Sequence, residues 1–136
     1  MKIAVRYYTR SGNTKRLAEA VAEAVAVEAK EITVPLSEPV DLLFLCSSYY
    51  AFDVDESVKK FVVANKEHIG KIVCVGTSAM MRSMKKPMKR VAAKVGVAVA
   101  DEEFHCRGQF AKVHSGRPNA DDLAAARTFA KARIEA

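Results

Sequence analysis

The stretch Tyr8-Thr9-Arg10-Ser11-Gly12-Asn13-Thr14 joins an apolar, β-branched run at residues 2–8 to an amphipathic run at residues 13–27. The first run predicts a strand, and the second, with an apolar residue in every turn, predicts a helix. Free backbone N–H groups and the positive end of the helix dipole then meet at this loop, which is a common geometry for binding phosphate. The segment therefore predicts both a β-α unit and a ligand that carries phosphate.

The residue types in this loop narrow the choice of ligand. The loop holds one glycine and lacks both the Gly-Lys pair of a Walker A motif and the three glycines of a dinucleotide-binding turn. Hydroxyls at Thr9, Ser11 and Thr14 suit the three oxygens of a terminal monophosphate. The alternative is an ordinary strand-to-helix turn in which Ser11 or Asn13 caps the helix.

Strand-like and helix-like runs alternate along the chain. The continuous apolar runs at residues 41–47 and 71–76 are typical of strands that are covered on both faces. The alternation predicts an α/β fold, a three-layer α-β-α sandwich around a five-stranded parallel sheet. Strands are expected at residues 2–8, 30–34, 41–47, 71–76 and 97–104, and helices at residues 13–27, after a cap at Asp55, from the turn with Pro87 to Gly96, and at residues 120–134.

Length and composition fit a single domain, residues 1–136. Half of the residues are hydrophobic, and no apolar run approaches the ~20 residues that span a membrane. The first residues lack the apolar stretch of a signal peptide, so we expect a cytoplasmic protein without membrane contact. Cys46, Cys74 and Cys106 show no Cys-x-x-Cys spacing, so they are expected to be packed thiols rather than members of a disulfide or metal site.

The charge of the chain is positive and unevenly spread. The net charge is +6, and no acidic residue lies between His68 and Ala100. The charged residues of that segment are Lys71, Arg82, Lys85, Lys86, Lys89, Arg90 and Lys94. They form either a solvated helix face or a docking surface for an acidic protein or a phosphorylated ligand. Nucleic-acid binding is not expected, because only the charge supports it and no basic-aromatic platform accompanies it.

A second loop, Cys46-Ser47-Ser48-Tyr49-Tyr50-Ala51-Phe52-Asp53, begins at the end of the apolar run at residues 41–47 and is rich in aromatic rings. A planar heteroaromatic ligand binds against a flat apolar partner, with a few hydrogen bonds at its edge. Tyr49 or Tyr50 is the expected stacking partner of such a ring. The alternative is that these aromatic side chains pack over the next helix.

Together these loops resemble those of the flavodoxin family. Residues 9–14 resemble its FMN phosphate loop, Thr/Ser-x-Thr/Ser-Gly-x-Thr, and Ser47-Ser48-Tyr49 resembles the segment whose aromatic residue flanks the isoalloxazine ring. Gly76-Thr77-Ser78-Ala79-Met80-Met81 occupies the place of the third flavin loop. The resemblance implies FMN as the cofactor, the strand order 2-1-3-4-5 and, from the chain length, the short-chain type.

The resemblance also implies which residues hold FMN, with the phosphate at the first loop and the ring at the second and third. The implied cofactor-binding residues are Thr9, Arg10, Ser11, Gly12, Asn13, Thr14, Ser47, Ser48, Tyr49, Tyr50, Ala51, Phe52, Thr77, Ser78, Ala79, Met80 and Met81. No set of nucleophile, base and orienting residue is visible in the sequence. The implied function is therefore electron transfer, with the cofactor supplying the redox chemistry.

The chain departs from the family pattern in two ways. Its third loop has neither Gly-x-Gly-Asp nor an aromatic residue, so Met80 or Met81 is expected to cover the outer face of the ring. Its charge is basic where typical flavodoxins are acidic, which predicts a less negative flavin potential and an acidic redox partner. The alternative functions are a non-redox or weakly flavin-binding domain of the same fold, and a small FMN-dependent reductase.

Overall fold

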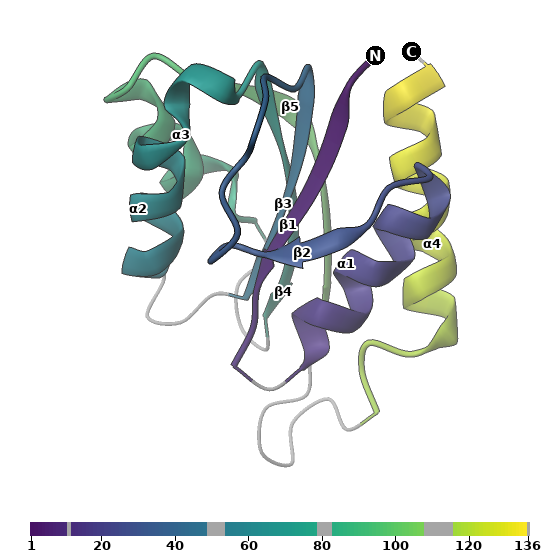
Figure 1. Cartoon of the computed structure of the whole chain (residues 1–136). Coiled ribbons are helices and arrows are strands. Elements are labelled where there is room, and N and C mark those ends of the chain that lie inside the picture. The colour runs from purple at the N-terminus through teal and green to yellow at the C-terminus, as the bar shows by residue number, and fades with distance from the viewer. Residues whose placement is uncertain (11, 49–53, 79–82, 108–115, 136) are drawn as a thin grey trace.

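The computed structural model describes residues 1–10, 12–48, 54–78, 83–107 and 116–135 (Figure 1). Within these residues, five strands form one parallel sheet in the order β2-β1-β3-β4-β5, which confirms the predicted order. The strands are β1 (Ile3–Tyr8), β2 (Ala29–Glu31), β3 (Leu42–Ser48), β4 (Lys71–Ser78) and β5 (Ala98–Arg107). The helices are α1 (Asn13–Ala24), α2 (Glu56–Ala64), the short 3-10 helix η1 (Lys66–His68), α3 (Lys85–Ala93) and α4 (Ala120–Glu135).

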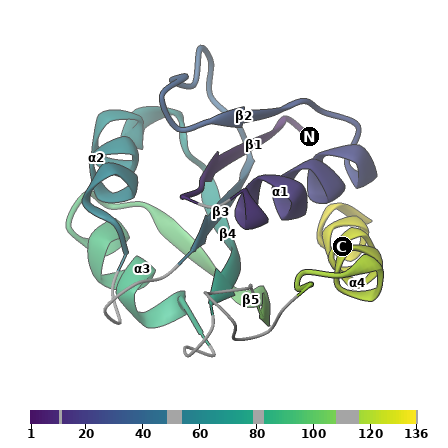
Figure 2. The ribbon, with the colours of Figure 1, turned by 90° about the horizontal axis from the view of Figure 1, so that it is seen from below.

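Helices cover both faces of the sheet, which gives the predicted three-layer sandwich. Helices α1 and α4 lie on one face, and α2 and α3 lie on the other (Figure 2). Alternate residues of β3 face the two sides: Phe44 and Cys46 pack with α1 and α4, whereas Leu43 and Leu45 pack with α2 and α3. Both faces of β3 are buried, which explains its continuous apolar sequence.

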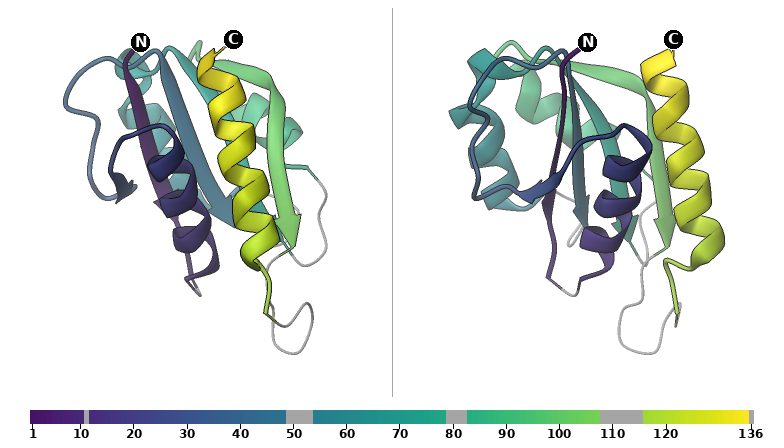
Figure 3. Two further views of the ribbon diagram at one scale, coloured as in Figure 1. Left: turned by 90° about the vertical axis from the view of Figure 1, so that its right-hand side faces the viewer. Right: turned by 45° about the vertical axis from the view of Figure 1, so that its right-hand side comes forward.

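All four α-helices follow parallel strands and begin at the same edge of the sheet, the carboxyl edge. The two chain termini lie at the opposite edge (Figure 1 and Figure 3). The strand register pairs Tyr8 with Ser47 and Ser48 with Thr77, which aligns the ends of β1, β3 and β4. The segments that follow these three strands therefore start side by side.

Helix α1 ends at Ala24, before the predicted end at Val27. Ala26 has a positive φ of 59°, and the N–H groups of Ala26 and Val27 bond to carbonyls of the preceding turn. This is the Schellman pattern, in which a left-handed residue, usually glycine, closes a helix. Helix α3 is closed in the same way by Gly96, whose φ is 72°. This agrees with the prediction that the helix ends at this glycine.

Strand β2 is short because the chain turns after Glu31. The Val34 N–H donates to the Glu31 carbonyl at 3.0 Å, and Arg6 Nε donates to the Val34 carbonyl at 2.9 Å. Arg6 is buried in β1, and its burial lowers the pKa of its guanidinium. A buried cation needs hydrogen-bond acceptors, and the turn supplies backbone carbonyls for it. The predicted strand at residues 30–34 is therefore wrong beyond Glu31.

Within the described residues, no group of three His, Cys, Asp or Glu side chains is placed to hold a metal ion. Cys46, Cys74 and Cys106 are free and buried. Burial raises the pKa of the Cys106 thiol to about 12, and this residue packs in the core with α1 and α4, as expected of a packed thiol. In the same part of the chain, no helix has the length and apolar character needed to cross a membrane.

Candidate functional site

The candidate site lies at the carboxyl edge of the sheet, around the ends of β1, β3 and β4. Figure 2 looks onto this edge and shows the start of α1 beside the ends of the central strands. In open parallel sheets, ligands bind in the crevice at this edge where the strand order reverses, which here is between β1 and β3.

The first turn of α1, as far as it is described, has no carboxylate and no side-chain cap. Gly12 precedes the helix with a left-handed backbone, φ +89°, and its N–H donates to Thr9 Oγ1 at 2.9 Å. A Cβ at Gly12 would meet nothing within 4 Å, so the space beside the loop is open. No acidic residue precedes Glu19 in the sequence. Among the described residues, therefore, no carboxylate caps α1 or lies in its first turn.

The predicted cap is wrong for Asn13, which is the first helical residue and not the cap. A capping asparagine needs an extended backbone, but here the chain enters the helix through the left-handed Gly12. Ser11, the other predicted cap, lies outside the described residues.

The other three α-helices each receive a carboxylate at their start. Asp55 caps α2 by accepting a backbone N–H of the first turn at 2.9 Å. Glu103 of β5 accepts the N–H of Met84, the residue before α3, at 3.1 Å. Asp122 of α4 accepts the N–H of the residue before that helix at 2.8 Å. Helix α1 thus differs from its three neighbours at the same edge.

Thr14 and Thr77 connect the first loop to the end of β4. Their hydroxyl oxygens lie 3.0 Å apart, and the residues are only 0% and 2% exposed. Because one hydroxyl donates to the other, the pair retains one O–H for a third acceptor. The fold therefore brings together two predicted site residues that are 63 positions apart in the sequence.

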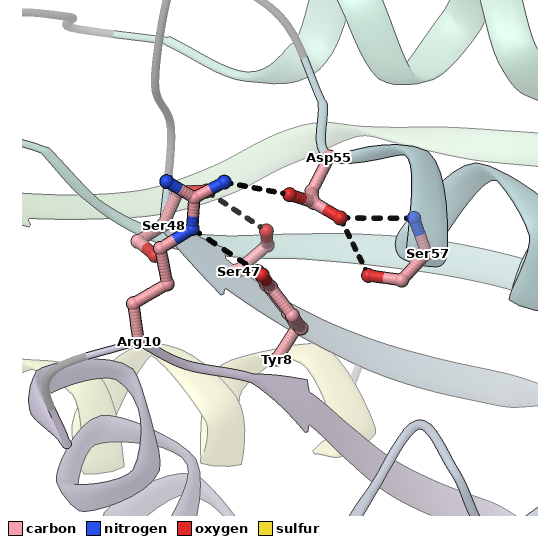
Figure 4. A network of polar contacts seen from close by, with 6 residues as sticks. All are labelled: Tyr8, Arg10, Ser47, Ser48, Asp55 and Ser57. Carbon is pink, nitrogen blue, oxygen red and sulfur yellow. Dashed lines mark hydrogen bonds and ion pairs between the residues drawn. The ribbon is translucent and has the colours of Figure 1, made fainter.

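Arg10 reaches from the first loop to the start of α2 (Figure 4). Its Nη2 lies 3.1 Å from Asp55 Oδ2, and its Nε donates to the Tyr8 hydroxyl at 3.3 Å. The Asp55 carboxylate also accepts from the hydroxyl and N–H of Ser57. The Ser57 hydroxyl in the first place, and Arg10 in addition, lower the pKa of Asp55. Since the Arg10 side chain is 54% exposed, this ion pair contributes little to folding stability.

Ser48 presents an unused hydroxyl at the end of β3 (Figure 4). The residue is 8% exposed, and its buried Oγ has no hydrogen-bond partner among the described residues. The neighbouring Ser47 donates its hydroxyl to the Ser48 carbonyl at 3.1 Å. Buried hydroxyls are nearly always hydrogen-bonded, so a ligand group that bonds Ser48 fits this position.

Comparison with known proteins identifies the architecture. No protein-family model matches the chain, and no curated protein matches it. Among solved structures, a flavodoxin from the domain Archaea is 19% identical, with a TM-score of 0.76 over 99% of this chain and 97% of that one. Flavodoxin 2 from Bacillus cereus is 16% identical, with a TM-score of 0.70 over 99% of each chain. The chain has the flavodoxin fold.

A third similar solved structure is that of a flavoprotein in complex with FMN. This flavoprotein from Lactobacillus acidophilus NCFM is 18% identical, with a TM-score of 0.66 over 78% of this chain and 92% of that one. At these identities the match establishes the shared fold.

Residue 76 near the end of β4 packs closely against Met84. A Cβ at Gly76 would overlap Met84 Sδ, so the fully buried Met84 side chain would have to shift to accommodate any other residue there. Glu103 then fixes the Met84 N–H. Sequence reasoning missed Glu103, because the pairing of β4 with β5 shifts register between Ile72 and Cys74 and no sequence pattern marks that shift.

Most residues predicted to contact a flavin ring lie outside the described part of the chain. These are Tyr49, Tyr50, Ala51, Phe52, Ala79, Met80 and Met81. Ser78 is described only as the last residue of β4. The described part of the predicted site is therefore its phosphate end, with Ser47, Ser48 and Thr77 at the neighbouring strand ends.

Proposed function

We propose that this chain binds FMN and acts as an electron-transfer protein. The observation that carries the proposal is the start of α1, which lacks the carboxylate found at the other described helix starts. A phosphate dianion there supplies the negative charge that Asp55, Glu103 and Asp122 supply to their helices. The flavodoxin fold and the FMN complex of the Lactobacillus flavoprotein support FMN as the ligand that carries this phosphate.

The described residues of the first loop fit a phosphate. The Thr9 hydroxyl accepts from the Gly12 N–H and still has its own O–H to donate. The pair of Thr14 and Thr77 retains a second O–H, and the open space beside Gly12 leaves room for the group. Neutral donors and a helix dipole hold a dianion without a lysine. We assign the phosphate to residues 9–14.

The ends of β3 and β4, which lie beside the start of α1, would hold the ring of the cofactor. The unpartnered Ser48 hydroxyl supports this placement, because it lies at the end of β3. Tyr49 and Tyr50 on one side, and Met80 and Met81 on the other, remain our predicted ring contacts. Bound FMN supplies the redox chemistry, and the chain binds and orients it.

Arg10 and Asp55 set the charge at the described end of the site. Reduction makes the flavin more negative, so nearby acidic groups lower its potential. Here Asp55 is paired with Arg10 and hydrogen-bonded to Ser57, which offsets part of its charge. We therefore expect a potential less negative than that of a typical acidic flavodoxin, as measured by redox titration of the FMN-loaded protein. A strongly negative potential for the second electron would contradict this expectation.

Titration with FMN and with riboflavin tests the proposal, because the two ligands differ only in the phosphate. We expect FMN to bind with a shift of its visible absorbance and quenching of its fluorescence. Riboflavin should bind at least about 100-fold more weakly, since it lacks the charged group that α1 holds. Equal affinities of FMN and riboflavin would show that the phosphate does not bind at the start of α1. If neither ligand binds, the electron-transfer function is overturned and a non-redox domain of the same fold remains.

A further inference from the structure

The outer surface of α3 carries a row of cations without partners. Lys86, Arg90 and Lys94 are spaced four residues apart, so they lie along one side of the helix. All three are exposed, and none forms an ion pair or side-chain hydrogen bond with the described residues. By contrast, Lys89 pairs with Asp101 of β5 at 2.9 Å. We call Lys86, Arg90 and Lys94 the α3 cation row.

The α3 cation row destabilises the helix that carries it. Like charges four residues apart repel each other. Lys86 also lies in the first turn, where the helix dipole favours acidic residues and disfavours cations. No acidic residue of the same segment relieves the repulsion, because none lies between His68 and Ala100. The described acids beside α3, Asp101 and Glu103 of β5, bond to Lys89 and Met84 and not to the row. A partner that brings negative charge to the row would relieve it.

The face of α2 and α3 fits a protein partner better than a nucleic acid. Val63 of α2, which contacts α3, is 47% exposed and is one of the few large apolar side chains exposed among the described residues. Helix α3 contains no aromatic residue on which a base could stack. Apolar contact surrounded by charge is typical of protein interfaces. Carboxylates about 6 Å apart, the rise of four helical residues, match the spacing of the row.

We propose that the α3 cation row is the docking surface for an acidic protein partner. The proposal rests on the proposed function, because an electron carrier needs a partner that can approach its cofactor. Helix α3 begins at the carboxyl edge of the sheet, so Lys86 lies at the end of the row nearest the candidate site. The partner binds the face of α2 and α3, opposite the face of α1 and α4 (Figure 2).

Neutralising the row tests this surface. The row variant is Lys86→Gln/Arg90→Gln/Lys94→Gln, and its matched control is Lys2→Gln/Lys30→Gln/Lys131→Gln, which removes the same charge from exposed positions away from α2 and α3. The probe is a plant-type [2Fe–2S] ferredoxin, an acidic one-electron carrier, titrated against the full chain by calorimetry at low ionic strength. We expect the row variant to bind at least about 10-fold more weakly than the wild type, and the control to stay within about 3-fold.

A single substitution separates docking from a structural role. Lys86→Glu places an acid in the first turn of α3 and opposite Arg90 one turn later, so it should raise the thermal midpoint by about 2 °C. The same change should weaken ferredoxin binding. If Lys86 instead stabilised the folded helix, Lys86→Glu would lower the thermal midpoint. That result would overturn the argument.

Three further results decide the proposal. Equal weakening in the row variant and its control would show that only net charge attracts the ferredoxin, which contradicts a docking surface. Binding of a single-stranded DNA of about 20 nucleotides that depends on the row, with no ferredoxin binding, would assign the surface to nucleic acid instead. Unchanged FMN affinity in a row variant that has lost ferredoxin binding supports docking, whereas a wild type that binds ferredoxin but no FMN overturns the proposed function.

Discussion

Helices α1 and α4 lie side by side on one face of the sheet and begin at the same edge, but their N-termini are built differently (Figure 3). At α4, Asn119 Oδ1 accepts from the Asp122 N–H at 3.0 Å, and Asp122 accepts from the Asn119 N–H at 2.8 Å. This reciprocal arrangement is a capping box. Arg117 also donates to both oxygens of the Asp122 carboxylate, at 2.5 and 2.7 Å. Among the described residues, no side chain caps α1 and no acid lies in its first turn.

The difference separates a helix start that the protein caps itself from the one that we propose binds a ligand. At α4 the carboxylate of Asp122 occupies the position of an external anion, so that helix start is complete without a ligand. At α1 the loop has hydroxyls and an open space beside Gly12, and among the described residues no acid lies in the first turn. The informative feature of the first loop is therefore the acid that it lacks, as much as the hydroxyls that it has.

Asn13→Asp would make the start of α1 resemble that of α4, and it should have the largest effect. FMN affinity should fall about 100-fold, because unit charges about 5 Å apart repel by roughly 3 kcal/mol at an effective dielectric constant of about 20. The matched control, Ala120→Asp, adds an acid to the first turn of α4 and should leave FMN affinity unchanged. Flavin fluorescence titration measures both. A similar loss in the two variants would refute the distinction between the helices.

Asp122→Asn would make the start of α4 resemble that of α1. It should lower the free energy of unfolding by about 1–2 kcal/mol and the thermal midpoint by about 5 °C, since the capping carboxylate loses its charge. Arg117 lowers the pKa of Asp122 in the folded protein. The stabilisation is therefore present above the unfolded pKa of about 3.9 and is lost as pH falls through the lower folded pKa. Urea unfolding at several pH values should show the wild type and the variant converging in acid, and a constant difference would contradict the assignment.

Asp55→Asn should have the smallest effect. Asparagine caps a helix as well as aspartate does, so α2 should remain stable. Arg10 loses its ion pair with Asp55, so less of its positive charge is neutralised near the phosphate, which should tighten FMN binding by about 2- to 5-fold. Arg10→Gln should remove this gain when it is combined with Asp55→Asn. Weaker FMN binding by Asp55→Asn would show that Arg10 does not face the ligand.

The sequence predicts the architecture because burial on both sheet faces leaves a pattern in it. Strand β3 is continuously apolar from Leu42 to Cys46, with Phe44 and Leu45 facing opposite layers, so its run could not be mistaken for an amphipathic surface strand. The first loop could also be predicted from the sequence, because its glycine and hydroxyls are neighbours in the chain. Local features of this kind need no knowledge of which segments meet in space.

The contacts between distant segments could not be predicted. Arg10 and Asp55 are 45 residues apart, and their contact depends on which loops the strand order brings together. Glu103 reaches α3 only because the register of β5 shifts beside it. Ala26 ends α1 in a left-handed conformation that alanine disfavours, so its residue type gave no signal. In each case the tertiary structure, and not the local sequence, decides the outcome.

The most direct test of the account is the backbone amide NMR spectrum of the full chain during titration with FMN. We predict that the largest shifts of amides in helix first turns occur at Gly12, Asn13 and Thr14, and that the amides of Asn119 and Asp122 barely move. Saturating FMN binding with unmoved amides at the start of α1, or with the largest shifts at the start of α4, would contradict the account.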